Sequence, residues 1–93
     1  MNNFLITPSQ CRAARELLGW KQSNLSDKAG VTLSTIGNFE RGLRDLRSSS
    51  VVKLNKAFTS VGITFVDDDQ NLGVLIKKKW ENSIFDNIMF AMW

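Results

Sequence analysis

The side chains that most often carry out catalysis are scarce in this sequence. It contains a single cysteine, Cys11, and no histidine. Without a histidine, no serine or cysteine nucleophile can be paired with an imidazole base, and no glycine-rich phosphate loop is present. We therefore predict that the protein is not an enzyme and that it binds no cofactor.

Metal and disulfide chemistry have equally few candidate residues. One cysteine cannot form a disulfide within the chain, and the absence of histidine leaves a zinc site almost without ligands. The acidic run 67–69 lacks the alternating spacing and the terminal glutamate of a calcium loop, so we interpret it as a solvated turn. Cys11 lies among apolar residues at helical spacing, which indicates a buried thiol. No metal site is predicted.

Charge is distributed unevenly along the 93 residues. Residues 1–62 contain nine Lys and Arg against four Asp and Glu, whereas residues 63–93 contain three against five. The net charge of +3 therefore comes from the first part. A basic part joined to a mildly acidic one is expected when only the basic part contacts a polyanion.

The sequence shows no pattern for membrane insertion or secretion. No apolar run approaches the ~20 residues that a membrane span needs. The N-terminus also lacks the charged and apolar regions of a signal peptide. Together with the single cysteine, these features predict a soluble cytoplasmic protein with no membrane partner.

Four helices are predicted in the first 62 residues. Thr7 is a helix cap followed by Pro8 in the first turn, and glycines stand where helices should stop. Apolar residues recur at three- and four-residue spacing between these boundaries. We place the helices at about residues 8–18, 22–29, 33–41 and 51–61, with Ser50 as the cap of the fourth.

The pattern changes to strands at Ile63. Residues 63–66 and 74–77 are short β-branched-rich runs separated by a polar loop, which predicts a hairpin. A hairpin alone is marginally stable in water, so it must pack on the helices or pair with a second subunit. We favour dimerisation through this hairpin.

The last segment, residues 80–93, has a pattern of its own. Apolar residues repeat in it every four positions, at Trp80, Ile84, Ile88 and Met92. That spacing permits an amphipathic C-terminal helix. We expect its aromatic stripe to pack against the domain, a dimer mate or a protein partner. Glu81 and Asp86 argue against an anionic membrane surface.

These observations predict a mainly α fold. A four- to five-helix domain is followed by a short β-hairpin and a possible C-terminal helix. We place the helical domain at residues 1–62 and an extension for dimerisation or partner binding at residues 63–93.

One segment, Gln22–Gly42, has the pattern of a helix-turn-helix. Two helices that cross closely need a small residue midway along the first, a glycine in the turn and an apolar residue in the second. Ser26, Gly30 and Ile36 stand at these positions. The apolar residues for the shared core follow the same spacing: Leu25, Val31 and Phe39.

On these residues the sequence resembles the Cro/repressor-type helix-turn-helix regulators of the XRE class. The matching stretches are Leu18-Gly-Trp-Lys-Gln22, Leu25, Lys28-Ala-Gly-Val31 and Ser34-Thr-Ile-Gly-Asn-Phe-Glu-Arg-Gly42. The resemblance covers about Thr7 to Phe58, and the later hairpin is similar to an extension of some bacterial members. The segment after Trp80 resembles no part of the family.

The resemblance implies that the third helix enters the major groove of double-stranded DNA. Side chains near its N-terminus would contact base edges at Leu33, Ser34 and Asn38. Asn38 has the chemistry for a bidentate pair with adenine, and Leu33 for contact with a thymine methyl group. These contacts would favour an A·T-containing half-site. An ordinary exposed helix face is the alternative interpretation.

The resemblance also assigns contacts with the DNA backbone. Gln22, at the start of the second helix, would meet a phosphate and the outermost base. The residues that would bind phosphates, and so fix register without contributing sequence specificity, are Thr32, Thr35, Arg41, Arg44 and Arg47. For the three arginines, a solvated basic linker is the alternative.

Arg15 and Glu40 match a family pair that ties the first helix to the end of the third, so both are predicted to be structural. Three other residues depart from the family pattern. Lys21 replaces the usual cap before the second helix, Gly37 lies inside the third, and Ser26 replaces a common alanine. We expect the Ser26 hydroxyl to bond a backbone carbonyl one turn earlier.

The expected function is that of a sequence-specific transcription regulator, a repressor that binds a pseudo-palindromic operator as a homodimer. The alternative is an antitoxin or accessory protein-binding module that captures a partner with residues 80–93. In the first case the protein would be cytoplasmic and associated with the nucleoid when bound to DNA.

Overall fold

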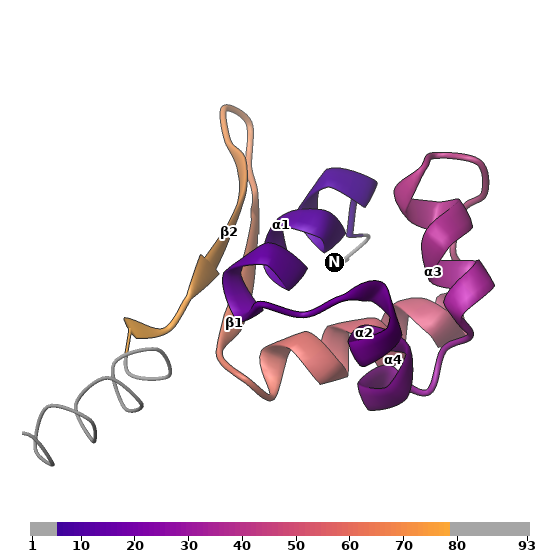
Figure 1. Ribbon diagram of the computed structural model, residues 1–93. Coiled ribbons are helices and arrows are strands. Elements are labelled where there is room, and N and C mark those ends of the chain that lie inside the picture. Colours follow the sequence, from indigo (N-terminus) through magenta and orange to yellow (C-terminus); the bar gives the residue numbers. More distant parts are fainter. Residues whose placement is uncertain (1–5, 79–93) are drawn as a thin grey trace, which may run out of the picture.

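The computed structural model describes residues 6–78. Four helices precede a two-stranded hairpin, which confirms the predicted mainly α fold (Figure 1). The elements are α1 Pro8–Leu18, α2 Gln22–Ala29, α3 Leu33–Glu40, α4 Ser48–Thr59, β1 Ile63–Asp67 and β2 Leu72–Ile76. The predicted C-terminal helix in residues 80–93 lies outside the described residues.

The start of α1 is a capping box. The Thr7 hydroxyl accepts a hydrogen bond from the backbone N–H of Gln10 at 3.1 Å, and the Gln10 side chain accepts one from the N–H of Thr7 at 3.0 Å. Two N–H groups that no helical carbonyl can reach are thereby satisfied. α2 begins differently, because Lys21 makes no side-chain cap and its N–H instead donates to Oδ1 of Asn24 at 2.8 Å.

The fourth helix begins earlier than predicted. α4 starts at Ser48 with Arg47 as its N-cap, so Ser50 is a residue of the first turn and not the cap. Leu46 and Val51 flank this start at the spacing of a hydrophobic staple, and Leu46 packs against the core while Val51 is buried. The packing of these two apolar residues sets the helix start. Capping preference depends only on neighbouring residues, so it could not predict this start.

A single hydrophobic core lies between the helices and the hairpin. Phe58 of α4 is at its centre, fully buried. Its ring stacks on Trp20, with centroids 5.9 Å apart, and meets Phe65 of β1 edge to face at 5.6 Å. These contacts join the loop before α2, α4 and the hairpin into one packed unit.

The hairpin packs on the helices, which was one of the two possibilities derived from its sequence. β1 and β2 pair in antiparallel register from Ile63 opposite Ile76 to Asp67 opposite Leu72. Ile63 is only 2% exposed. The side-chain amide of Gln10 in α1 donates to two backbone carbonyls of the hairpin, Val66 at 2.9 Å and Gly73 at 3.0 Å. Helix α1 therefore fixes the hairpin from one side.

Neither a membrane-spanning helix nor a metal-binding cluster is found in the described part of the chain. Within residues 6–78, no helix combines the length and the apolar character needed to cross a membrane. The same residues contain no group of three or more His, Cys, Asp or Glu side chains that could hold a metal ion.

Candidate nucleic-acid interface

The turn between α2 and α3 sets the crossing of the two helices. Gly30 adopts a positive φ of 71°, which a side chain would disfavour, and Leu25 and Ile36 on either side are fully buried. The Ser26 hydroxyl donates to the carbonyl of Val31 at 2.6 Å. The expected bond to a carbonyl one turn earlier is therefore wrong. Ser26 bonds forward across the turn, because the crossing brings the Val31 carbonyl to it.

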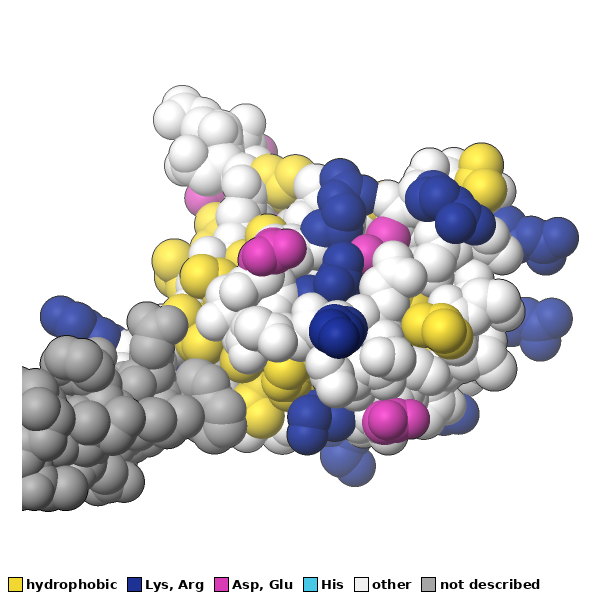
Figure 2. Space-filling view, viewed as in Figure 1, with side chains coloured by type: hydrophobic (Ala, Val, Ile, Leu, Met, Phe, Trp, Pro, Cys, Tyr) yellow, Lys and Arg dark blue, Asp and Glu magenta, His cyan; other side chains and the backbone are white. Residues whose placement is uncertain are grey.

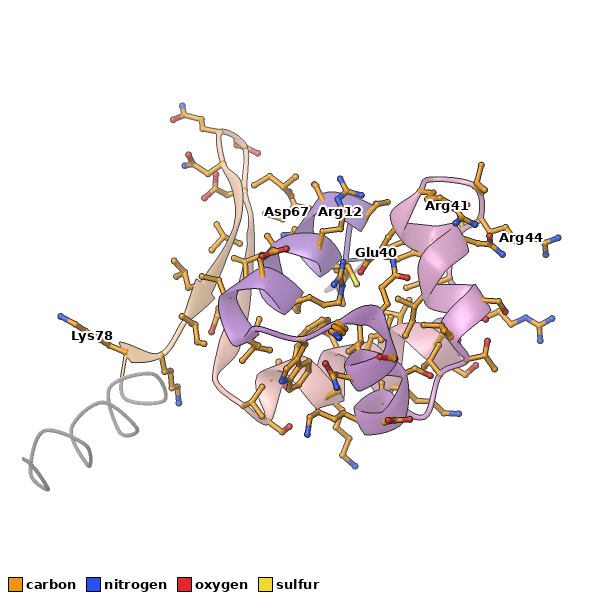
Figure 3. The ribbon with its side chains drawn as sticks, viewed as in Figure 1. Arg12, Glu40, Arg41, Arg44, Asp67 and Lys78 are labelled. Atoms are coloured by element: carbon orange, nitrogen blue, oxygen red, sulfur yellow. The ribbon has the colours of Figure 1, made fainter. Side chains whose placement is uncertain are left out.

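The inner end of α3 carries a closed cluster of polar side chains around Glu40. Arg15 donates two hydrogen bonds to this carboxylate, from Nη2 to Oε1 at 2.7 Å and from Nε to Oε2 at 2.8 Å. Cys11 donates to Oε2 at 3.0 Å and Gln22 donates to Oε1 at 2.9 Å. Arg12 donates to the backbone carbonyl of Glu40. Figure 3 shows Arg12 of α1 pointing toward Glu40.

Burial and hydrogen bonding act on the Glu40 carboxyl in opposite directions. Burial on its own raises its pKa, but hydrogen bonds from Arg15, Cys11 and Gln22 outweigh burial and hold the pKa below the ordinary value of a glutamate. For Cys11, burial and the neighbouring Glu40 both raise the pKa of the thiol. The thiol is thus a neutral donor to a charged carboxylate, and it is fully buried as the sequence predicted.

The cluster also contains a residue that the sequence assigned to DNA. The Gln22 side chain donates one amide hydrogen to Glu40, and the second hydrogen on Nε2 is not used in that bond. The carboxylate therefore orients the Gln22 amide. This contact is absent from the sequence-based expectation, because nothing in the spacing of Gln22 and Glu40 shows that they meet.

The opposite, outer side of α3 leaves its polar groups open. Thr32, Leu33 and Ser34 are exposed, and Thr35 and Asn38 are half-buried. Thr32 caps the helix by accepting the N–H of Thr35 at 3.3 Å, as predicted, and the two threonine hydroxyls share a 2.7 Å hydrogen bond. Of the predicted base-contacting residues, Ser34 and Asn38 thus share one face of α3, because they are four residues apart, while Leu33 lies to one side of it.

A polar hollow of about 440 Å³ adjoins this face. Its walls come from the turn before α3, from α3 itself, and from the loop and first turns that begin α4. Of the predicted DNA-contacting residues it contains Thr32, Ser34, Thr35, Asn38, Arg44 and Arg47, whereas Gln22, Leu33 and Arg41 do not line it. We call this hollow the α3–α4 groove.

The groove contains three residues that the sequence reasoning missed: Ser49, Ser50 and Lys53. The N–H groups in the first turn of a helix have no helical partner, and in α4 no N-cap side chain accepts from them. These groups and the helix dipole favour an anion. Three cations, Arg44, Arg47 and Lys53, line the groove against the single carboxylate of Asp45. Because α4 starts at Ser48, earlier than the sequence predicted, Ser49 and Ser50 lie in its first turn and line the groove.

Backbone hydrogen bonds at the end of α3 hold the turn that contains Arg41 and precedes Arg44. The N–H groups of Gly42 and Leu43 donate back to the carbonyls of Phe39 and Asn38, at 2.9 and 2.8 Å, so the helix ends in a Schellman motif. Arg41 and Arg44 lie at this end, far from Lys78 beyond the hairpin (Figure 3). Figure 2 shows Lys and Arg side chains over the helices, and most of the hydrophobic surface beside the hairpin.

Comparison with known proteins agrees with this geometry. A family model described as helix-turn-helix matches residues 12–65, which include all of α2, α3 and α4. No curated protein shows significant similarity to the chain. With more than half of its residues matched, and with α2 and α3 crossing at a glycine turn, the chain belongs to the Cro/repressor-type, XRE-class helix-turn-helix family of DNA-binding transcription regulators.

Proposed function

We propose that this regulator is a repressor that binds a pseudo-palindromic operator as a homodimer. The observation that carries the proposal is the outer side of α3, where exposed polar side chains adjoin the α3–α4 groove and its three cations. Base-contacting and phosphate-binding groups then lie side by side, as a helix in the major groove requires.

Sequence specificity would come from the first half of α3. The exposed Ser34 can donate to or accept from a base edge, and Leu33, which is 49% exposed, offers an apolar surface for a thymine methyl group. Asn38 lies one turn further along the same face and carries an amide. These three side chains would enter the major groove together.

Affinity would come from the DNA backbone. Thr32 and Thr35 provide hydroxyls at the start of α3, while Arg44, Arg47 and Lys53 provide positive charge in the groove. The uncapped first turn of α4 would bind a phosphate between these cations. Each phosphate that a lysine or arginine neutralises releases counterions, so binding should weaken steeply with salt.

Dimerisation would use the hairpin. Leu75 of β2 is 59% exposed on one face of the hairpin, whereas Val74 and Ile76 on the other face pack on the core. Leu72, at the start of β2, is 51% exposed. A second copy that covered these leucines would bring two α3 helices to one face of DNA, about 34 Å apart in successive major grooves. Sedimentation equilibrium tests this step. Leu75→Ser should weaken the dimer, and Val52→Ser, an equally exposed position on α4, should not.

The function itself is tested by selection from a randomised duplex pool, followed by salt titration on the enriched sequence and on random duplex. We expect an enriched palindrome with two half-sites, bound more tightly than random DNA. Arg44→Ala should weaken binding to both duplexes alike, while Lys78→Ala, an equal loss of charge remote from the groove, should change little. Binding without any enriched sequence would contradict the proposal.

A second function, capture of a protein partner by residues 80–93, rests on the Trp, Phe and Met content of that segment. Deletion of these residues separates the two functions. A regulator that acts through α3 should keep its affinity for a single half-site, whereas a module that needs its partner should lose the complex recovered by co-purification.

A further inference from the structure

We propose that Arg41 determines which base Asn38 selects, and that the pair favours guanine over adenine. The inference rests on the proposed function, because it assumes that α3 enters the major groove. It differs from the sequence-based expectation in two respects: Arg41 was expected to bind a phosphate, and Asn38 to pair with adenine.

The geometry of the pair fixes the orientation of the Asn38 amide. Nη2 of Arg41 donates to Oδ1 of Asn38 at 2.8 Å. A guanidinium group can only donate, so the oxygen of the amide must face it and the NH₂ group must face away. The two residues are three apart, the spacing at which side chains meet on one helix face. The Asn38 NH₂ group and the second lone pair of Oδ1 are thus the parts left for a base.

Adenine and guanine present different groups to such an amide. In the major groove, adenine offers the N7 acceptor and the N6 donor, so a bidentate contact needs both the NH₂ group and the oxygen of Asn38. Guanine offers two acceptors, N7 and O6, and needs only donors. With one lone pair of Oδ1 engaged by a charged donor, the N6–H donor of adenine would have to approach the remaining lone pair beside a positive charge, whereas that charge attracts the two acceptors of guanine.

Arg41 adds to this preference through its own remaining hydrogens. Its guanidinium has five N–H groups, of which one is used on Asn38. It is exposed, and among residues 6–78 no carboxylate forms a salt bridge with it. The pair therefore presents mainly donors and a positive charge, so an edge made of acceptors complements it best.

Arg41 also differs from the cations expected to bind phosphates. Arg44, Arg47 and Lys53 line the α3–α4 groove, whereas Arg41 does not. It follows Glu40 directly at the end of α3, and its carbon chain reaches back along the helix to Asn38. This position makes it a positioning residue for Asn38.

The test is selection from a randomised pool with the natural chain, Asn38→Ala, Arg41→Ala and Arg44→Ala. The position whose preference disappears in Asn38→Ala is the one that Asn38 contacts. At that position the natural chain should favour guanine over adenine by about tenfold in Kd. Arg41→Ala should reduce this ratio at least about tenfold, because the positive charge and the donors that favour guanine are then gone and Oδ1 can accept from adenine without a cation beside it. Arg44→Ala should weaken binding to the guanine-containing and the adenine-containing duplex equally and leave the ratio of the two Kd values unchanged.

Two results would overturn the inference while leaving the proposed function intact. One is a preference for adenine in the natural chain. The other is an unchanged guanine-to-adenine ratio in Arg41→Ala, with a uniform loss of affinity and a shallower salt dependence, which would make Arg41 a phosphate contact. A natural chain that enriches no sequence would overturn the proposed function and this inference together. Unfolding curves of the Arg41 and Asn38 variants that match the natural chain would show that the fold is unaffected.

Discussion

Polar side chains lie on both sides of α3. Those on the inner side, around Glu40, are hydrogen-bonded within the protein, whereas those on the outer side are open to solvent. On the inner side, the four hydrogen bonds to the Glu40 carboxylate all come from within the protein, and the residue is 4% exposed. On the outer side, Thr32, Ser34 and the cations of the α3–α4 groove face solvent. A buried polar group must find its partner inside the fold, whereas an exposed one is free for a ligand.

This difference shows how one short helix serves both stability and binding. α3 has eight residues, and Glu40, Arg15 and Cys11 anchor its C-terminal end to α1. Its N-terminal end is capped by Thr32 and otherwise projects outward. Anchoring one end holds the other in a fixed position, which lowers the entropy lost when the outer side binds. Substitutions on the inner side should therefore change stability, and those on the outer side should change binding.

The largest effect is expected from Arg15→Met. The variant keeps an apolar chain in place but leaves the buried Glu40 carboxylate without its cation, so the free energy of unfolding at neutral pH should fall by about 3 kcal/mol. Urea denaturation measures it. Arg44→Met, which removes the same charge from the exposed side, should change stability by less than about 0.5 kcal/mol. Equal stability of the two variants would remove the distinction between the two sides.

A second prediction concerns acid. The pKa of Glu40 is lower in the folded protein than its ordinary value of 4.5, so the carboxylate contributes stability that is fully present above pH 4.5 and is lost as pH falls through the folded pKa. Between neutral pH and pH 3, the natural chain should therefore lose more stability than Glu40→Gln does. Urea titrations at pH 7, 5, 4 and 3 compare them. Parallel curves would show that Glu40 does not titrate in this way.

On the outer side, Lys53→Ala should act on binding alone. Lys53 lines the α3–α4 groove, and Lys56, three residues further along α4, is exposed outside it. Loss of one phosphate contact should lower the slope of log K against log salt by about 0.9. Lys56→Ala is the matched control and should keep the natural slope. If the two variants are indistinguishable, only the overall charge matters and the groove has no special role.

The smallest effect is expected at Gly37, which lies buried between the two sides. A Cβ added there would meet Oε1 of Gln22 at 3.6 Å, an ordinary van der Waals distance, so space does not require a glycine. Gly37→Ala should stabilise the protein by about 0.5–1 kcal/mol through its higher helix propensity. Thermal and urea unfolding measure it. A destabilised variant would show that Gln22 cannot adjust, and that its contact with Glu40 is tightly constrained.

The helices that the sequence predicted well are those whose ends are set locally. The predicted bounds of α1 and α2 match the structure, because Thr7, Gly19 and Gly30 act through the backbone of their own neighbours. α4 was misplaced by local reasoning, since three consecutive serines offer similar caps. None of the three serines is the cap: α4 starts after Arg47, next to Leu46, which packs against the core.

The contacts that the sequence could not give are those between distant residues. The bond from Cys11 to Glu40, the bond from Gln22 to the same carboxylate and the place of Lys53 in the groove each depend on how the helices cross. The Arg15–Glu40 ion pair forms, and its expectation came from family resemblance and not from spacing. Patterns of residue type therefore located α3, while its partners on the inner side required the packed structure.

The most direct test is to titrate the isotope-labelled full chain with the selected operator and follow its backbone amide resonances by NMR. Our account predicts that the largest changes occur at residues 32–38 and 48–50, on the outer side of α3 and at the start of α4. The hairpin turn at residues 67–71 should change little. Changes concentrated in the hairpin, with α3 and the start of α4 unaffected, would contradict the assignment of the outer side of α3 to DNA.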